Sequence, residues 1–337
     1  MHSVLSTLAE DHYDNILMTE DLERLKTVAS VTCRTDLLHA DEDALIDALR
    51  EADADVMLTA WQAPKVTTRV LQEWPKLKYF CHTGGELKHY LDREVLESGL
   101  LVTNWGRCTS HSTAEGALAM TLAVLRRYQN MPFWMRVEGL YWDVPDPATE
   151  GLFYQRVGLH GLGAIAQEFV RLIKPFDCRI SAYSPHCPDE VFEKLGVKRA
   201  DSLEELYSSN RIISCHASLR PDTHHLVGEK LLGLIEDGGY FVNTSRGAVV
   251  DTDALVAELE TGRIYAALDV FEEEPLPAEH PLRDLENALL VPHMAGPTAD
   301  RRRDMGKHAV DNIIAWARGK EDELDGIVTL DKFDLMT

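Results

Sequence analysis

The chain lacks the cysteine spacing typical of zinc and dithiol sites. Its six cysteines stand singly, with no CxxC pair among them: Cys33, Cys81, Cys108, Cys178, Cys187 and Cys215. We therefore predict no metal site. Several of these thiols lie in apolar runs, where a free cysteine packs as a small hydrophobe, and this pattern fits a reducing cytosol.

Long apolar segments are also missing. No run is long enough to span a bilayer. The first residues, Met1–Leu5, show no basic region followed by an apolar signal core. We therefore expect a cytoplasmic protein with no membrane partner.

An excess of basic residues is absent as well. The chain has 34 Lys and Arg against 56 Asp and Glu, for a net charge of −22. This charge argues against nucleic-acid binding through a basic surface. A strongly acidic surface would also repel an anionic substrate, so such a ligand would need a buried arginine. Solubility is the simpler explanation of the charge.

The 337 residues suffice for two domains, and the pattern that is present predicts α/β structure. Short apolar runs at 56–60, 77–81 and 100–104 read as strands, and 43–51 and 93–98 between them read as helices. This alternation is typical of a parallel sheet covered by helices on both faces.

A second strand–helix series follows a change of pattern near residue 104. A helix is predicted over 111–127 and an irregular arm over 131–155, before the series that runs from 156 to 293. A last helix is expected from about 300 to 316. We predict two Rossmann-like parallel-sheet domains. The discontinuous first one, for substrate binding, takes residues 1–103 plus 300–337, and the dinucleotide-binding one takes 104–299.

A glycine-rich turn opens the second series. The strand-like run Val157–His160 leads directly into Gly161-Leu162-Gly163-Ala164-Ile165-Ala166, which has the form G-x-G-x-x-A. The first glycine permits a tight turn and the second lets a pyrophosphate approach the backbone, at a helix N-terminus that favours phosphate. A simple packing turn is the alternative. The strand–turn–helix context favours dinucleotide binding.

The next predicted strand ends at Ser184-Pro185-His186. An acidic residue usually binds the ribose hydroxyls of NAD at this place. Ser184 removes the negative charge that would repel a 2′-phosphate, but no arginine stands beside it to bind one, and His186 would help only weakly at neutral pH. The cofactor is therefore NAD or NADP.

Three polar residues follow short apolar runs later in the chain. They are Arg246 in Asn-Thr-Ser-Arg-Gly, Glu274 before Pro275, and His293 in Pro-His-Met-Ala-Gly. Reduction of a 2-keto acid needs such a set, in which the arginine holds a carboxylate, the histidine moves a proton and the glutamate tunes the histidine. Arg246 could instead be a surface residue, and His293 could be structural. Without other information, Glu274 is no better placed than Glu272 or Glu273.

With these motifs in order, the chain resembles the D-isomer-specific 2-hydroxyacid dehydrogenases, a family that includes glyoxylate and hydroxypyruvate reductases and phosphoglycerate dehydrogenases. The resemblance covers nearly the whole chain and is strongest from about residue 156 to 300. It implies a flavodoxin-like N-terminal domain, an active site in the interdomain cleft, a small 2-keto or 2-hydroxy acid as substrate, and a homodimer formed through the cofactor domain.

The resemblance also assigns roles to residues. Arg246 would bind the substrate carboxylate and keto oxygen, His293 would act as the acid–base residue, and Glu274 would favour its charged form. Asp269 would hold the nicotinamide carboxamide, and Thr83, Gly84 and Gly85 would give backbone N–H groups to the carboxylate. The predicted cofactor contacts are Gly161, Gly163, Ala164, Ile165, Ser184, Pro185, His186, His216, Ala217, Thr223, Thr244, Ser245, Arg246, Asp269, His293 and Gly296.

Two other functions remain open. A non-catalytic NAD(H)-sensing protein on the same fold is the first, although such a protein has no need of Arg246, Glu274 and His293 together. Oxidation of formate or phosphite is the second, and the formate enzymes that resemble this family lack the glutamate.

Overall fold

The computed structural model describes residues 2–145 and 148–334, which form two compact units. Unit 1 comprises Met1–Thr109 and Pro297–Thr337, and unit 2 comprises Ser110–Gly296. The first unit is therefore discontinuous. None of the helices in the described ranges is both long and apolar enough to cross a membrane.

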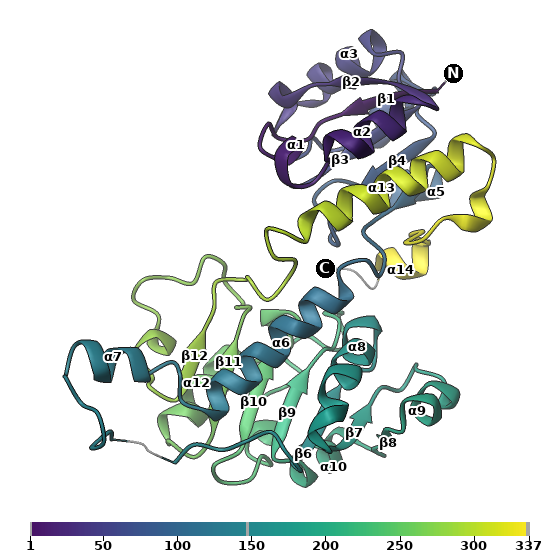
Figure 1. The fold of residues 1–337 in the computed structure, drawn as a ribbon. Helices are drawn as coiled ribbons and strands as arrows, with labels where there is room; N and C mark the ends of the chain where they lie inside the picture. Colours follow the sequence, from purple (N-terminus) through teal and green to yellow (C-terminus); the bar gives the residue numbers. More distant parts are fainter. Residues whose placement is uncertain (1, 146–147, 335–337) are drawn as a thin grey trace. The chain divides into compact units, whose positions relative to one another are not determined.

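Unit 1 contains a five-stranded parallel sheet in the order β2-β1-β3-β4-β5. This is the flavodoxin-like order that was predicted. The strands are β1 (His2–Ser6), β2 (Ala29–Cys33), β3 (Val56–Thr59), β4 (Tyr79–His82) and β5 (Leu101–Thr103). Its helices are α1 (His12–Asn15), α2 (Thr19–Lys26), α3 (Glu42–Glu51), α4 (Thr68–Glu73), α5 (Arg93–Glu97), α13 (Arg302–Ala317) and α14 (Leu330–Asp334) (Figure 1).

Unit 2 contains a seven-stranded parallel sheet in the order β12-β11-β10-β9-β6-β7-β8. The strands are β6 (Arg156–His160), β7 (Arg179–Tyr183), β8 (Lys198–Arg199), β9 (Ile212–Cys215), β10 (Tyr240–Asn243), β11 (Tyr265–Leu268) and β12 (Ala288–Leu290). The strand order reverses between β6 and β9, and ligands of doubly wound sheets bind at such a point.

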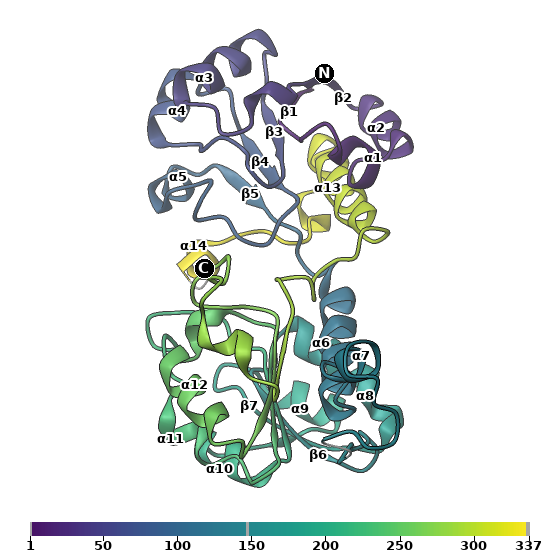
Figure 2. The ribbon, with the colours of Figure 1, turned by 90° about the vertical axis from the view of Figure 1, so that its left-hand side faces the viewer.

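The helices of unit 2 cover both faces of its sheet, as Figure 2 shows. They are α6 (Ser110–Leu125), α7 (Met131–Arg136), α8 (Ala164–Ile173), α9 (Asp189–Leu195), α10 (Leu203–Ser209), α11 (Glu229–Leu232) and α12 (Thr252–Glu260). The arm predicted to be irregular therefore contains α7. Its Trp134 is 2% exposed and supplies an apolar anchor for this short helix.

Each sheet is buried on both faces because successive residues of a strand enter different cores. On β1, Leu5 and Val4 belong to separate clusters of buried residues, and on β10 the same holds for Phe241 and Val242. This two-sided burial explains why the strands are continuous apolar runs in the sequence.

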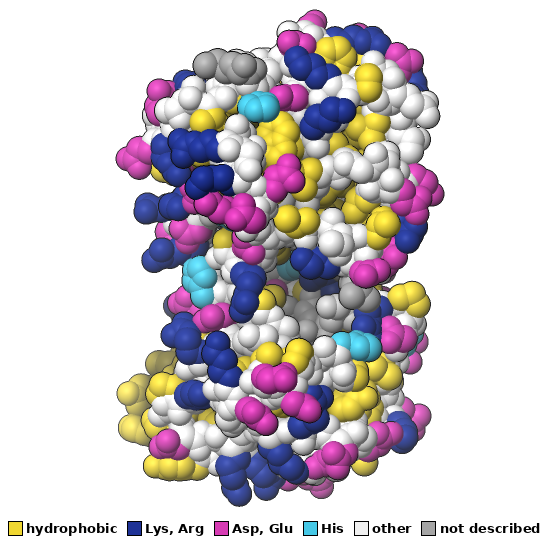
Figure 3. Space-filling view, turned by 90° about the vertical axis from the view of Figure 1, so that its right-hand side faces the viewer, with side chains coloured by type: hydrophobic (Ala, Val, Ile, Leu, Met, Phe, Trp, Pro, Cys, Tyr) yellow, Lys and Arg dark blue, Asp and Glu magenta, His cyan; other side chains and the backbone are white. Residues whose placement is uncertain are grey.

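Acidic and basic side chains are interspersed over the face drawn in Figure 3. Exposed ion pairs are found in the described part of the chain, for example Arg24–Asp311 and Arg69–Asp43. The excess of acidic residues therefore coexists with local charge pairing. Exposed pairs of this kind contribute little to stability individually.

Candidate active site

The glycine-rich turn connects β6 to α8 as the sequence predicts. Gly161 has φ +98°, and a Cβ atom on it would come within 2.8 Å of the carbonyl oxygen of His216. Only glycine fits this close crossing of two chain segments. Gly163 precedes the first residue of α8 and has open space around its missing side chain. The N-terminus of α8 is therefore accessible to a phosphate group.

A cavity of about 410 Å³ lies along this turn. It is lined by predicted cofactor residues from four segments of unit 2: Gly161, Gly163, Ser184, Pro185, His186, His216, Ala217 and Thr223. Because these residues surround the reversal point of the strand order, they lie where a dinucleotide binds in this fold.

The other predicted cofactor residues lie outside the lining of this cavity. Ala164 and Ile165 form the start of α8, and Thr244 and Ser245 follow the end of β10. Gly296 ends unit 2, three residues after His293.

Two histidines beside the turn are uncharged at neutral pH. Burial lowers the pKa of His216 to about 4 and that of His160 to about 4. Nε2 of His216 lies 2.9 Å from Oγ of Ser214, and Nδ1 of His160 lies 3.2 Å from the hydroxyl of Tyr207. These rings therefore supply packing and hydrogen bonds, and give no positive charge to a pyrophosphate.

The expectation that no arginine stands beside Ser184 is wrong. Arg199 comes from β8, the strand next to β7, and its Nη1 donates to the carbonyl oxygen of Ser184 at 3.1 Å. Its Nη2 donates to the Cys187 carbonyl oxygen at 2.6 Å and pairs with Asp189 at 2.8 Å. A positive charge is therefore present where the usual acidic residue is absent. Sequence proximity could not reveal it, because strand pairing brings it there.

The turn that carries Arg246 is folded by a buried asparagine. Asn243, at the end of β10, is 1% exposed. Its Oδ1 accepts hydrogen bonds from the N–H of Ser245 at 3.0 Å and from the Ser245 hydroxyl at 2.8 Å. Its Nδ2 donates to the carbonyl oxygen of Arg246 at 3.0 Å. Asn243 had no predicted role, and its position directly after an apolar strand was the available signal.

This turn packs tightly against the loop after β11. A Cβ atom on Gly247 would lie 1.8 Å from the carbonyl carbon of Phe271, a distance that no side chain tolerates. In the same loop, the N–H of Phe271 donates to Oε1 of Glu274 at 2.9 Å. The arginine turn and the glutamate loop are therefore in direct backbone contact.

Glu274 and His293 form a hydrogen-bonded pair. Oε2 of Glu274 lies 2.7 Å from Nδ1 of His293, and the two side chains are 34% and 54% exposed. Since Nδ1 faces the carboxylate, Nε2 is the ring nitrogen left to exchange a proton. His293 has φ +52°, a strained conformation that functional sites often retain. Both residues border a cavity of about 600 Å³ that Arg283 also lines.

Asp269 fixes the segment that carries His293. Its side chain is 2% exposed, and its Oδ1 accepts from the N–H groups of Met294 at 2.6 Å and Ala295 at 2.9 Å. Its carbonyl oxygen accepts from the N–H of His293 at 2.8 Å. Burial raises the pKa of Asp269, although the two backbone N–H groups oppose this shift. Oδ2 makes no hydrogen bond within the described ranges and can accept one from a ligand.

The predicted substrate loop follows β4 in unit 1. Thr83 donates both its N–H, at 2.8 Å, and its hydroxyl, at 3.1 Å, to the carbonyl oxygen of Thr59. Thr83 therefore anchors the loop. Gly84 and Gly85 accept hydrogen bonds at their carbonyl oxygens from Trp105 and Asn104, and no bond of their N–H groups is found in the described part of the chain.

Comparison with known proteins identifies the family. Residues 118–295 match the family model described as the D-isomer specific 2-hydroxyacid dehydrogenase NAD binding domain. The chain is 35% identical over 283 residues to a glyoxylate reductase of Thermococcus litoralis, covering 82% of this chain and 84% of that protein. A solved Thermus thermophilus protein superimposes with a TM-score of 0.78 at 29% identity, covering 97% of this chain and 99% of the other.

A D-3-phosphoglycerate dehydrogenase of Methanocaldococcus jannaschii is 30% identical over 311 residues. These residues are 92% of this chain but 56% of that relative, so the chain spans little more than half of its length.

The chain belongs to the D-isomer-specific 2-hydroxyacid dehydrogenase family. It is accordingly an NAD(P)-dependent oxidoreductase, and the match to the NAD binding domain covers the glycine turn and the Arg246, Glu274 and His293 segments.

Proposed function

We propose that the protein transfers hydride reversibly between NAD(P)H and a small 2-keto acid, giving a D-2-hydroxy acid. The observation that carries this proposal is the hydrogen bond between His293 and Glu274, whose loop packs against the Arg246 turn. A protein that only senses NAD(H) does not need an acid–base pair beside an anion anchor.

Each residue has a chemical role in this reaction. The bound nicotinamide supplies the hydride to the keto carbon. Arg246 binds the carboxylate and orients the keto group. His293 gives a proton from Nε2 to the keto oxygen as it gains charge, and Glu274 stabilises the imidazolium before transfer. Asp269 accepts the carboxamide N–H at Oδ2, while its Oδ1 holds the His293 segment.

The two units divide the binding tasks in this proposal. Unit 2 binds the dinucleotide along the glycine turn and the cavity beside it. Unit 1 binds the substrate carboxylate through the N–H groups of Gly84 and Gly85, while Thr83 keeps the loop in place.

The six cysteines are all free thiols, which supports a reducing, cytoplasmic environment.

A panel of small 2-keto acids, assayed with NADH and with NADPH, tests the function. We expect oxidation of the reduced cofactor with at least one acid, among which glyoxylate and hydroxypyruvate should be included, and a D product where the product is chiral. Arg199 beside Ser184 supports use of NADPH, because a 2′-phosphate could replace the exposed Asp189 as the partner of its guanidinium. Tight binding of NADH without turnover on any acid would instead favour the sensing function.

We also propose a homodimer formed through unit 2. Exposed large apolar side chains are concentrated in residues 128–154: Tyr128, Phe133, Met135, Val137, Tyr141, Trp142, Phe153 and Tyr154. Trp142 is 86% exposed. Such a concentration is typical of a protein–protein interface, and a second copy of the chain is the partner that the family resemblance implies.

Light scattering measures this association. We expect a mass of twice the 37.9 kDa chain. Replacing Tyr141 and Trp142 by glutamate should shift the protein toward the single-chain mass, because two buried, unpaired carboxylates oppose association. Matched glutamate substitutions at exposed Leu226 and Met294 serve as the control. A wild-type protein of single-chain mass at micromolar concentration would contradict the proposal.

A further inference from the structure

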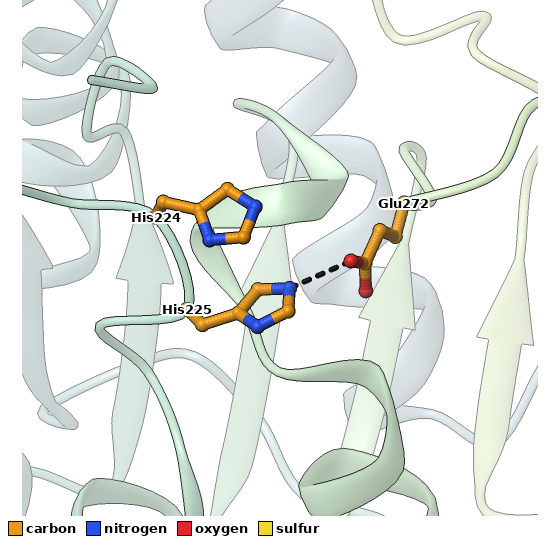
Figure 4. Close-up of side chains that lie close together, drawn as sticks. All are labelled: His224, His225 and Glu272. Carbon is orange, nitrogen blue, oxygen red and sulfur yellow. Dashed lines mark hydrogen bonds and ion pairs between the residues drawn. The ribbon is translucent and has the colours of Figure 1, made fainter. Parts of the chain in front are cut away.

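A cluster of two histidines and a glutamate lies in unit 2 and takes no part in the proposed reaction (Figure 4). His224, His225 and Glu272 each offer one ligand atom, and these atoms all lie within 4.8 Å of one another. No other group of three or more His, Cys, Asp or Glu side chains that could hold a metal is found among the described residues.

The backbone brings both imidazoles to one side. His225 has φ +51°, and its N–H donates to the carbonyl oxygen of Ala248 at 2.9 Å. Adjacent residues of an extended chain point in opposite directions. Here the rings stack instead, with centroids 4.0 Å apart and an angle of 26° between planes. Figure 4 shows a nitrogen of each ring on the side of Glu272.

Glu272 is held toward these nitrogens from a different segment. Its Oε1 lies 2.6 Å from Nε2 of His225, and its Oε2 accepts from the Thr252 hydroxyl at 2.9 Å. An outer hydrogen bond of the Thr252 kind typically orients a metal ligand.

We propose that His224, His225 and Glu272 bind one Zn²⁺ ion, with water completing the coordination. Two imidazoles and one carboxylate are ligands that zinc takes readily. Tetrahedral ligand atoms at zinc bond lengths lie about 3.3 Å apart. Here the three ligand atoms are all within 4.8 Å of one another, and those of His225 and Glu272 are 2.6 Å apart. His224 is exposed and the other two side chains are 36% exposed, so small rotations complete the approach.

Bound zinc would join two loops of unit 2. The first loop contains Thr223, which lines the cofactor cavity, and the second contains Glu274, the partner of His293. The proposal does not depend on the redox reaction, because none of the three ligands was assigned to catalysis or to cofactor binding.

Equilibrium dialysis against ZnCl₂ tests the site. The full chain is first freed of metal with a chelator, and the zinc bound after dialysis is measured by metal analysis. We expect one Zn²⁺ per chain. His225→Asn should lower the affinity by at least about 100-fold, since even outer-shell partners are worth roughly 10–100-fold. Asparagine tolerates the positive φ of this position. Thr252→Val should lower the affinity by about 10-fold.

His89→Asn is the matched control, because this histidine is 83% exposed and lies in unit 1. It should leave zinc binding unchanged. Binding of NADH checks that His225→Asn is folded. If this variant does not fold, His224→Asn repeats the test, because the His224 side chain is exposed. No zinc bound by the wild type, or equal affinity in the wild type and in both histidine variants, would overturn the proposal.

Discussion

Replacing His293 by alanine should reduce kcat for keto-acid reduction by about 10²–10⁴-fold, the usual contribution of a placed proton donor. The keto oxygen would then gain charge with no acid within reach of it. NADH affinity should change far less than kcat, because eight of the predicted cofactor contacts line the cavity beside the glycine turn and are untouched by this replacement. Steady-state rates together with NADH titration measure both quantities.

The matched control is His280→Ala, a partly exposed histidine of the same unit that hydrogen-bonds the backbone of Leu282. It should retain turnover. Glu274→Gln should give an intermediate loss, since the imidazole would keep a hydrogen-bond partner but lose the opposing charge. Full turnover of His293→Ala on every accepted acid would remove His293 from the mechanism.

Replacing Arg246 by glutamine should lower kcat/KM for carboxylate substrates. The free energy of the transition state should rise by about 2–5 kcal/mol, the cost of leaving the bound carboxylate without its partner charge. This range corresponds to roughly 30-fold to several thousand-fold, at about 1.4 kcal/mol for each factor of ten. Arg246→Lys should recover only part of the loss, because an ammonium group cannot bind a carboxylate with a planar fork.

Two comparisons separate carboxylate binding from a structural role of Arg246. A 2-keto aldehyde has no carboxylate, so its reduction should respond far less to Arg246→Gln than that of the matching acid. Arg171→Gln, on the exposed surface of α8, should have no effect on either substrate. Equal losses for the acid and the aldehyde would show that Arg246 only supports its turn.

The sequence predicted what depends on contiguous residues. The glycine turn is formed by neighbours in the chain, and its φ of +98° at Gly161 is a local requirement. The alternation of apolar runs with helical patterns likewise follows from burial of both sheet faces. The order of the strands in a sheet does not follow from this alternation. The flavodoxin-like order of unit 1 was predicted from the family resemblance.

The sequence could not predict contacts that strand pairing creates. Arg199 reaches Ser184 only because β8 lies beside β7. The choice of Glu274 among three consecutive glutamates came from the family resemblance and its place before Pro275, and the separate contacts of Glu272 were not predicted. Glu274 bonds His293, whereas Glu272 bonds His225 and Thr252. Residues two apart in an acidic run thus serve two different clusters, and periodicity carries no information about this division.

The missing side chain of Gly247 has a consequence for how new specificities can arise. Because backbone meets backbone there, no space is left for a side chain between the Arg246 turn and the Glu274 loop. Any side chain at position 247 would therefore displace the turn that carries Arg246, the loop that carries Glu274, or both. New specificities should therefore arise at positions outside this backbone contact, with Gly247 kept unchanged.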